Sequence, residues 1–176
     1  HGGEDAVGSQ AIARAEVHAG PLPQREQAMI QAYRTFTQGN PGEARRIYET
    51  LLAKNPEDVD AWYGLGDAWF HDDSIAIPAR FTASLRAFKR ALVLDPGYAL
   101  AFDHANFILG RAARPHPPWV LLPGDSIAML GDGKRRSVDS LAEVQAVARA
   151  RNESVTLARE WANLQPEIPK AHGALL

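Results

Sequence analysis

The sequence has no cysteine among its 176 residues, which excludes disulfide bonds, thiolate chemistry and cysteine zinc sites. It also lacks any apolar run of about 18 residues, so we expect no membrane-spanning helix within it. Its first ten residues, HGGEDAVGSQ, are polar and acidic where a secretory signal would be basic and then apolar. The formal charge of −2 offers no basic surface for nucleic acid, which we do not expect as a partner. These features are compatible with either a cytoplasmic or an extracytoplasmic location.

The alternation of apolar and polar residues that is typical of β-strands is also scarce, and most of the chain shows helical periodicity. Hydrophobic residues make up 45% and charged residues 23% of the chain, as is typical of one folded domain. Apolar residues recur at intervals of three and four, the spacing of one helix face, on both sides of the breaker Gly39–Gly42. The best strand candidate is Trp119–Leu122, which stands between prolines.

A two-helix unit occurs at least twice. Asn55-Pro56 and Asp95-Pro96 lie 40 residues apart, and an aromatic-rich segment follows each step. Proline disfavours helical geometry in the residue before it, so each step predicts the end of a helix. The unit before Asn55 has the spacing Ala44-x-x-x-Tyr48, which returns as Ser84-x-x-x-Phe88 in the next unit.

These residues resemble the tetratricopeptide repeat, a 34-residue helix-turn-helix with the pattern W-x-x-L-G-x-x-Y, A-x-x-x-F and P. The match has two units, residues 25–58 and 59–98, and a partial third, residues 99–114. The second unit is six residues too long, with the excess at the turn between its helices. The signature positions of units one and two are Ala32, Ala44, Tyr48 and Pro56, then Trp62, Leu65, Gly66, Trp69, Ser84, Phe88, Ala91 and Pro96. The resemblance implies an all-α solenoid.

Two glycine motifs resemble parts of nucleotide-binding motifs, but each lacks residues that such a motif requires. Gly64-Leu65-Gly66 lacks the third glycine of a dinucleotide fingerprint, because Trp69 occupies that position. Residues 131–134, GDGK, lack both the earlier glycine and the following Ser or Thr of a phosphate-binding loop. We interpret Gly66 as a packing residue that allows a partner helix to approach closely.

Outside the repeats we expect three segments. Residues 1–24 form an N-terminal tail with a short helix, and residues 115–139 form a long proline-rich loop packed by its own apolar side chains. Ser140 and Glu143 have the spacing of a capping box that starts a helix. Residues 140–176 are then a degenerate or capping helix pair, with a break near residues 151–153.

In stacked repeats the first helix of each unit lines the concave face. The resemblance therefore implies a partner-binding groove, aromatic and mildly acidic, which suits a peptide with apolar anchors and a basic residue. Its residues are Met29, Tyr33, Phe36, Tyr63, Asp67, Phe70, His71, Asp103, Phe107 and Arg111. The clamp that binds heat-shock chaperone C-termini (Lys, Asn, Asn, Lys, Arg) is not matched. Its positions hold Met29, Tyr33, Gly64, Leu100 and His104.

The sequence supports a catalytic or metal-binding site less well than it supports the partner-binding groove. His71-Asp72-Asp73, with His104 from the next unit, is the best metal-like cluster, but three adjacent helical residues cannot face one point. A solvated helix end explains it better. A catalytic triad could be imagined from His104 or His116 with an aspartate and Ser126, but nothing in the sequence supports its geometry. We expect no catalytic residues, no metal and no cofactor.

A softer resemblance covers residues 10–110, which look like repeat regions beside bacterial serine/threonine kinases and signalling regulators, although no kinase motif is present. The sequence thus predicts a non-catalytic module that binds a protein or peptide partner in its groove. The alternative is a structural subunit that assembles through its outer faces and loop, so oligomerisation is possible. A third possibility is a small-ligand or metal site beneath the loop.

Overall fold

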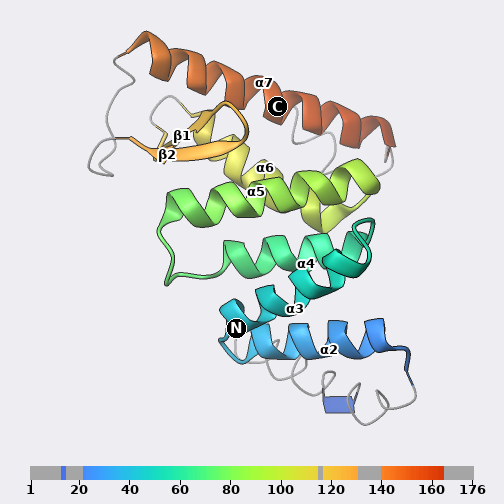
Figure 1. The fold of residues 1–176 in the computed structure, drawn as a ribbon. Helices are drawn as coiled ribbons and strands as arrows, with labels where there is room; N and C mark the ends of the chain where they lie inside the picture. The colour runs from blue at the N-terminus through green and yellow to red at the C-terminus, as the bar shows by residue number, and fades with distance from the viewer. Residues whose placement is uncertain (1–12, 15–21, 115–116, 131–139, 165–176) are drawn as a thin grey trace.

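The computed structural model describes residues 13–14, 22–114, 117–130 and 140–164, and it is dominated by helices (Figure 1). The rest of the predicted N-terminal tail, the GDGK motif and residues 165–176 lie outside the described residues. The described elements are α2 (Gln24–Thr37), α3 (Pro41–Lys54), α4 (Val59–Phe70), α5 (Ile77–Leu94), α6 (Ala99–Ala112), β1 (Trp119–Leu122), β2 (Ser126–Met129) and α7 (Leu141–Leu164).

The helices pair and stack in chain order, from α2 at one end to α7 at the other (Figure 1). Unit one is α2 with α3, and unit two is α4 with α5, which agrees with the predicted repeats. The two Asx-Pro steps end α3 and α5 in nearly the same way: Asn55 (φ −137°, ψ 93°) and Asp95 (φ −135°, ψ 95°) are both extended. The described chain therefore adopts a solenoid of stacked two-helix units, the mainly helical architecture that the sequence predicted.

Local signals explain where these helices begin. The side chain of Asn40 accepts a hydrogen bond from the Glu43 N–H, and Pro41 follows at the first helical position of α3. Asp58 caps α4 in the same way by accepting from the Ala61 N–H at 3.1 Å. At the start of α7, Ser140 and Glu143 exchange backbone-to-side-chain hydrogen bonds of 3.2 Å, which confirms the predicted capping box.

The two glycines of the Gly-x-Gly motif are packing residues inside α4. Both are buried, and a Cβ on Gly66 would lie 2.6 Å from the ring of Phe88. A Cβ on Gly64 would overlap the ring of Tyr48. The hydroxyl of Ser84 donates to the Gly66 carbonyl at 3.0 Å, so α5 lies directly against α4 here. This confirms the packing interpretation of Gly66.

Two large apolar cores hold the described part of the chain together, beside a small cluster of Val120, Leu130 and Ala146 between the hairpin and α7. The N-terminal core joins α2, α3, α4 and one residue of α5, and it is made of Ala32, Ala44, Tyr48, Leu51, Leu52, Ala61, Leu65, Ala68 and Ala87. The C-terminal core joins α5, α6, the strands and α7. Its largest members are Phe81, Phe88, Phe102, Trp119 and Trp161. Trp62 and Trp69 are only partly buried at the edges of these cores.

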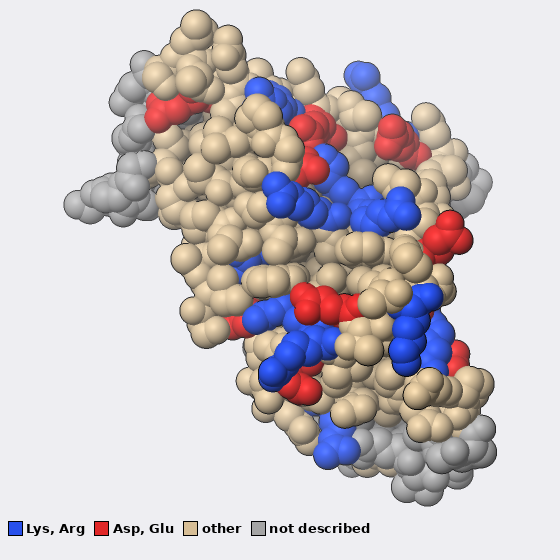
Figure 2. All heavy atoms as spheres, in the orientation of Figure 1, with Lys and Arg blue, Asp and Glu red and all other residues tan. Residues whose placement is uncertain are grey.

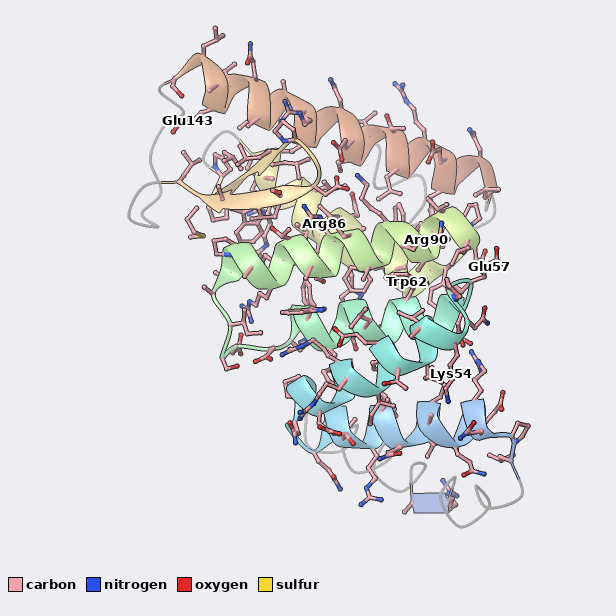
Figure 3. All side chains as sticks on the ribbon, viewed as in Figure 1. Lys54, Glu57, Trp62, Arg86, Arg90 and Glu143 are labelled. Carbon is pink, nitrogen blue, oxygen red and sulfur yellow. The ribbon has the colours of Figure 1, made fainter. Side chains whose placement is uncertain are left out.

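The predicted long loop contains a β-hairpin. The expected strand Trp119–Leu122 is present, but it pairs antiparallel with Ser126–Met129, a partner that the sequence analysis did not find. Gly124 (φ +73°) and Asp125 (φ 60°) form the turn. Most of the apolar residues of this segment are buried as predicted, but Leu122 is 39% exposed and Met129 is only partly buried. Arg86 of α5 donates to the Gly124 carbonyl and holds the turn against the helix (Figure 3).

The predicted break near residues 151–153 is wrong, because α7 is one continuous helix from Leu141 to Leu164. Contacts with neighbouring helices outweigh the modest helix preference of asparagine and serine. Glu153 accepts from Lys89 of α5 at 2.9 Å, and Ser154 donates to Asn106 of α6 at 2.8 Å. In the described structure α7 packs along α6 and takes the place of its partner helix.

The extra length of unit two is shared between a six-residue connection, residues 71–76, and an α5 of 18 residues against 14 in α3. On the face drawn in Figure 2, basic and acidic side chains lie intermixed. Among the described residues no helix is both long and apolar enough to cross a bilayer.

Candidate partner-binding groove

The first helices of the units, α2, α4 and α6, contain nine of the ten predicted groove residues, and the tenth, His71, is the C-cap of α4. Five of these residues, from α2 and α4, line one pocket of about 410 Å³. The remaining pocket residues come from α3, α4, the turn before α6, and α6. The complete lining is Met29, Tyr33, Phe36, Tyr48, Asp60, Tyr63, Gly64, Asp67, Tyr98 and Leu100.

Three tyrosines of this pocket, Tyr48, Tyr63 and Tyr98, are neutral hydrogen-bonding groups. Burial, followed by the charge of Asp67, raises the pKa of Tyr48 and of Tyr63 above the ordinary value of 10.0. Burial and the carboxylate of Asp60 raise the pKa of Tyr98 to about 12. The phenols therefore keep their protons at physiological pH, and the negative charge of the pocket comes from its two carboxylates.

Asp60 belongs to an ion-pair network at one end of the pocket. Arg25 donates to it at 2.9 Å and to the buried carboxylate of Asp58 at 2.6 and 2.7 Å. The Tyr98 hydroxyl donates to Asp60 at 3.2 Å. Hydrogen bonding to Arg25 lowers the pKa of Asp58, against the opposing effect of burial. Because its side chain is 53% exposed, Asp60 can still meet a ligand.

Four other predicted residues form a second group along the same face. Phe70 lies edge-on to His71 and to Phe107, with ring centroids 5.0 and 5.4 Å apart. The guanidinium of Arg111 lies over the Phe107 ring at 4.4 Å. Asp103 of α6 is exposed. The structure thus brings nine of the ten predicted groove residues into two adjoining groups, the pocket and this aromatic group.

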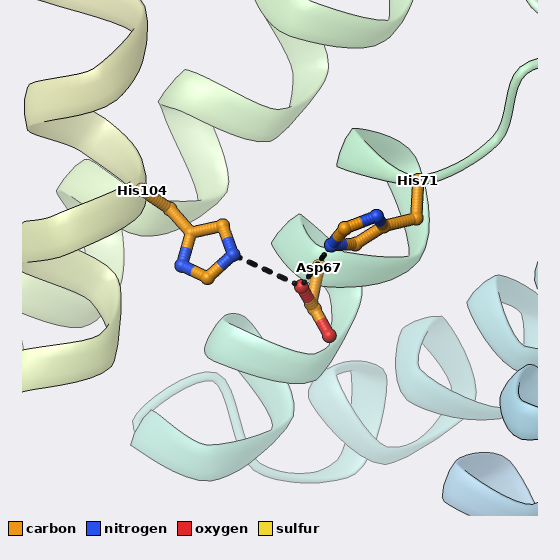
Figure 4. Close-up of side chains that lie close together, drawn as sticks. All are labelled: Asp67, His71 and His104. Carbon is orange, nitrogen blue, oxygen red and sulfur yellow. Dashed lines mark ion pairs between the residues drawn. The ribbon is translucent and has the colours of Figure 1, made fainter. Parts of the chain in front are cut away.

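Asp67, His71 and His104 meet where the two groups adjoin (Figure 4). One oxygen of Asp67, Oδ1, lies 3.4 Å from Nε2 of His71 and 3.4 Å from Nε2 of His104. The hydrogen bond with Asp67 raises the pKa of His71 above its ordinary value of 6.5, although burial acts the other way. His104 uses its other ring nitrogen, Nδ1, to contact the Leu100 carbonyl at 2.8 Å.

His71 and His104 lie together as the sequence suggested, but the carboxylate between them is Asp67 and not Asp72 or Asp73. Asp72 is buried and accepts from Arg45 and Ser74, which lowers its pKa. Asp73 pairs with Arg80. The three adjacent residues thus face different partners, as predicted, and Asp67 is the carboxylate that joins the histidines. The signal for the Asp67–His71 contact was available, since the two residues have the i, i+4 spacing of a helical turn and His71 is the C-cap of α4.

The hypothetical triad gains no support. Ser126 lies in β2, where its hydroxyl accepts from Arg86 at 3.2 Å, whereas His104 contacts Asp67 and the rings around it. His116 lies outside the described residues.

The stacked two-helix units and their groove define the class of protein, a helical-repeat scaffold. Residues 31–99 match the tetratricopeptide repeat family, whose repeats generally mediate protein–protein interaction. The chain is also 39% identical over 49 residues to superkiller protein 3 of Schizosaccharomyces pombe. That similarity covers 28% of this chain, which spans only 3% of the length of the yeast protein.

Proposed function

We propose that this chain is a non-catalytic module that captures a peptide or partner segment in its groove, with a lysine or arginine of the partner seated in the pocket. One observation carries the proposal: five aromatic rings and two carboxylates, Asp60 and Asp67, line a single pocket of about 410 Å³. Aromatic faces and carboxylates both attract a cation, and the rings also bury its aliphatic stem.

The neighbouring aromatic group supports an extended ligand. Phe107 is 39% exposed on α6, and Tyr33 is 49% exposed on α2, so apolar surface is accessible at both ends of the groove. Apolar residues of a partner that flank the basic residue would lie along this surface. Anchoring by a few rings around a polar contact is typical of peptide recognition.

The test is selection of random peptides displayed on phage against the immobilised chain, followed by fluorescence anisotropy with the selected peptides. We expect enrichment of a lysine or arginine flanked by apolar residues. Tyr33→Ala should weaken binding about 2- to 30-fold, the effect of losing a cation–π contact of about 0.5–2 kcal/mol. Asp60→Asn should weaken the same peptides and reduce the salt dependence of their binding.

Val93→Ala is the matched control, because Val93 is 69% exposed on α5 and does not line the pocket. Tyr33 is half exposed, so its truncation should leave circular dichroism and thermal unfolding nearly unchanged. Selected peptides that lack a basic residue, or that bind Tyr33→Ala and Asp60→Asn as tightly as the wild type, would contradict the proposal.

A second candidate function is assembly through the outer faces, and apolar exposure on α7 favours it. Leu141 and Val144 are 73% and 51% exposed near the start of this helix, and Leu164 is 53% exposed at its end. This alternative predicts self-association in sedimentation experiments that Val144→Ser reduces and Tyr33→Ala does not change. The association with bacterial kinases and signalling regulators stays a prediction.

A further inference from the structure

We propose that Asp67, His71 and His104 form a binding site for a divalent transition-metal ion, with zinc as the best fit. The inference revises the expectation of no metal, and it does not rest on partner capture. Each residue offers one ligand atom, and these atoms all lie within 4.8 Å of one another. Two imidazole nitrogens and one carboxylate oxygen are a donor set for zinc and similar ions, whereas calcium and magnesium prefer oxygen alone.

The distances within the cluster match the edges of a coordination tetrahedron. Zinc lies about 2.0–2.2 Å from nitrogen and oxygen ligands, which places two ligand atoms of a tetrahedral site about 3.3–3.5 Å apart. Asp67 Oδ1 lies 3.4 Å from Nε2 of each histidine. Two of the three ligand–ligand edges are therefore already at the required length, and side-chain rotation can adjust the third.

The hydrogen bond of His104 prepares its Nε2 for a metal. The Leu100 carbonyl can only accept, so Nδ1 carries a proton and donates to it at 2.8 Å. In the neutral ring, Nε2 then points an unshared electron pair toward the carboxylate of Asp67. Two acceptors facing each other need a cation between them, either a proton or a metal ion. A backbone carbonyl that orients a metal-binding histidine is a common outer partner in metal sites.

Aromatic rings hold the two imidazoles in place. Phe70 lies edge-on to both, with centroids 5.0 Å from each, and Phe88 lies 5.0 Å from His104. Phe36 contacts His71 from α2 at 5.9 Å. The site is still accessible, because the His71 side chain is 53% exposed. Three protein ligands and an open side leave a fourth position for water or another ligand.

The experiment measures Zn²⁺ binding by calorimetry and Co²⁺ binding by visible absorption, which is intense in four-coordinate sites and weak in six-coordinate ones. The chain used as reference has glutamine in place of its other four histidines, at positions 1, 18, 116 and 172, so that they cannot bind metal. We expect one ion per chain, a four-coordinate Co²⁺ spectrum and no response to Mg²⁺.

His71→Gln, His104→Gln and Asp67→Asn should each weaken Zn²⁺ binding more than about 100-fold, beyond the 10- to 100-fold cost of losing an outer partner. Asp73→Asn, a neighbouring carboxylate outside the cluster, should stay within about twofold. Circular dichroism checks the fold of each variant. NMR of the reference chain tests the site with all three ligands intact. Zn²⁺ should shift the ring signals of His71 and His104.

The site would be refuted by Zn²⁺ affinity that the three substitutions leave unchanged, by a six-coordinate Co²⁺ spectrum, or by ring signals that Zn²⁺ does not move. The outcome is separable from the peptide experiment, because Tyr33→Ala and Asp60→Asn leave all three ligands intact and neither histidine lines the pocket.

Discussion

The two cores of this chain are built from different residues. In the N-terminal core five of the nine buried residues are alanines, and the helices approach closely around them. The C-terminal core also contains seven alanines among its 18 buried residues, but it adds five large rings. Phe102 stacks on Trp161 at 4.6 Å, and Phe81 meets Trp119 edge-on at 4.9 Å. Small residues suit repeated helix pairs, whereas large rings fill the irregular space among two helices, a hairpin and α7.

The polar contacts differ in the same way. In the N-terminal half Asp58 both caps α4 and pairs with Arg25, one unit away in the chain. In the C-terminal half Lys89 of α5 joins Asp125 of the hairpin turn and Glu153 of α7, at 2.6 and 2.9 Å. Burial lowers the pKa of Lys89, but these two carboxylates outweigh that effect and raise it. Repeats thus use contacts between neighbouring units, and the C-terminal end uses contacts between distant segments.

The largest effect should come from removing a ring that joins the hairpin to the helices. Trp119→Ala should lower the free energy of unfolding by about 3–5 kcal/mol, because Trp119 is 4% exposed and its indole N–H donates to the Ile108 carbonyl. Urea unfolding followed by circular dichroism measures this. Hydrogen exchange should show lost protection in α5–α7 and not in α2 and α3.

Leu122→Ala, on the exposed side of the same strand, is the control and should change stability by less than about 0.5 kcal/mol. A Trp119→Ala variant as stable as this control would mean that the hairpin is not part of the C-terminal core.

A smaller effect should follow from adding one methyl group where α4 meets α5. Gly66→Ala should destabilise the chain by about 1–3 kcal/mol, because the new Cβ would meet the fully buried ring of Phe88. Gly110→Ala in α6 is the matched substitution, and it should stabilise by about 0.5–1 kcal/mol because no atom lies within 4 Å of its Cβ. Thermal unfolding that moves both variants in the same direction would contradict this contrast.

The smallest effect is a dependence on pH in the N-terminal half. Arg25 lowers the pKa of Asp58 below its ordinary value of 3.8, so the pair stabilises the fold above that pH and is lost as the pH falls through the folded-state pKa. Asp58→Asn keeps a cap for α4 but cannot form the ion pair. We expect it to cost about 1 kcal/mol at pH 7, and we expect this cost to shrink as the pH falls below 3.8 and through the folded-state pKa.

Unfolding free energies measured in urea from pH 2 to pH 7 test this prediction. Asp95→Asn is the comparison, because Asp95 is exposed after α5. An equal loss for both variants at pH 7 would show that the Arg25 pair adds nothing to the cap.

Most of the solenoid could be predicted from the sequence because its causes are local. The Asx-Pro steps end α3 and α5, the capping box starts α7, and Trp69 rules out a dinucleotide fingerprint at Gly64-Leu65-Gly66. The ten groove residues follow from the repeat pattern, which assigns each one to a first helix. Whether a partner occupies this groove is a separate question, since a fold specifies no ligand.

The remaining features depend on contacts between residues far apart in the chain. The strand Ser126–Met129 carries little pattern of its own and forms against Trp119–Leu122 and α5. The unbroken α7 is decided by Lys89 and Asn106, which hold residues 153 and 154 in place. The choice of Asp67 over Asp72 as the partner of His71 follows from Arg45, which engages Asp72 from another unit.

By itself, then, the sequence determined the helix boundaries, the repeat and the faces that its residues share, because hydrogen bonds and periodicity within a few residues decide these features. Only the tertiary structure decided the hairpin, the continuity of α7 and the position of His104 beside Asp67 and His71. Each of these depends on which side chains other helices bring alongside, and no local pattern encodes that.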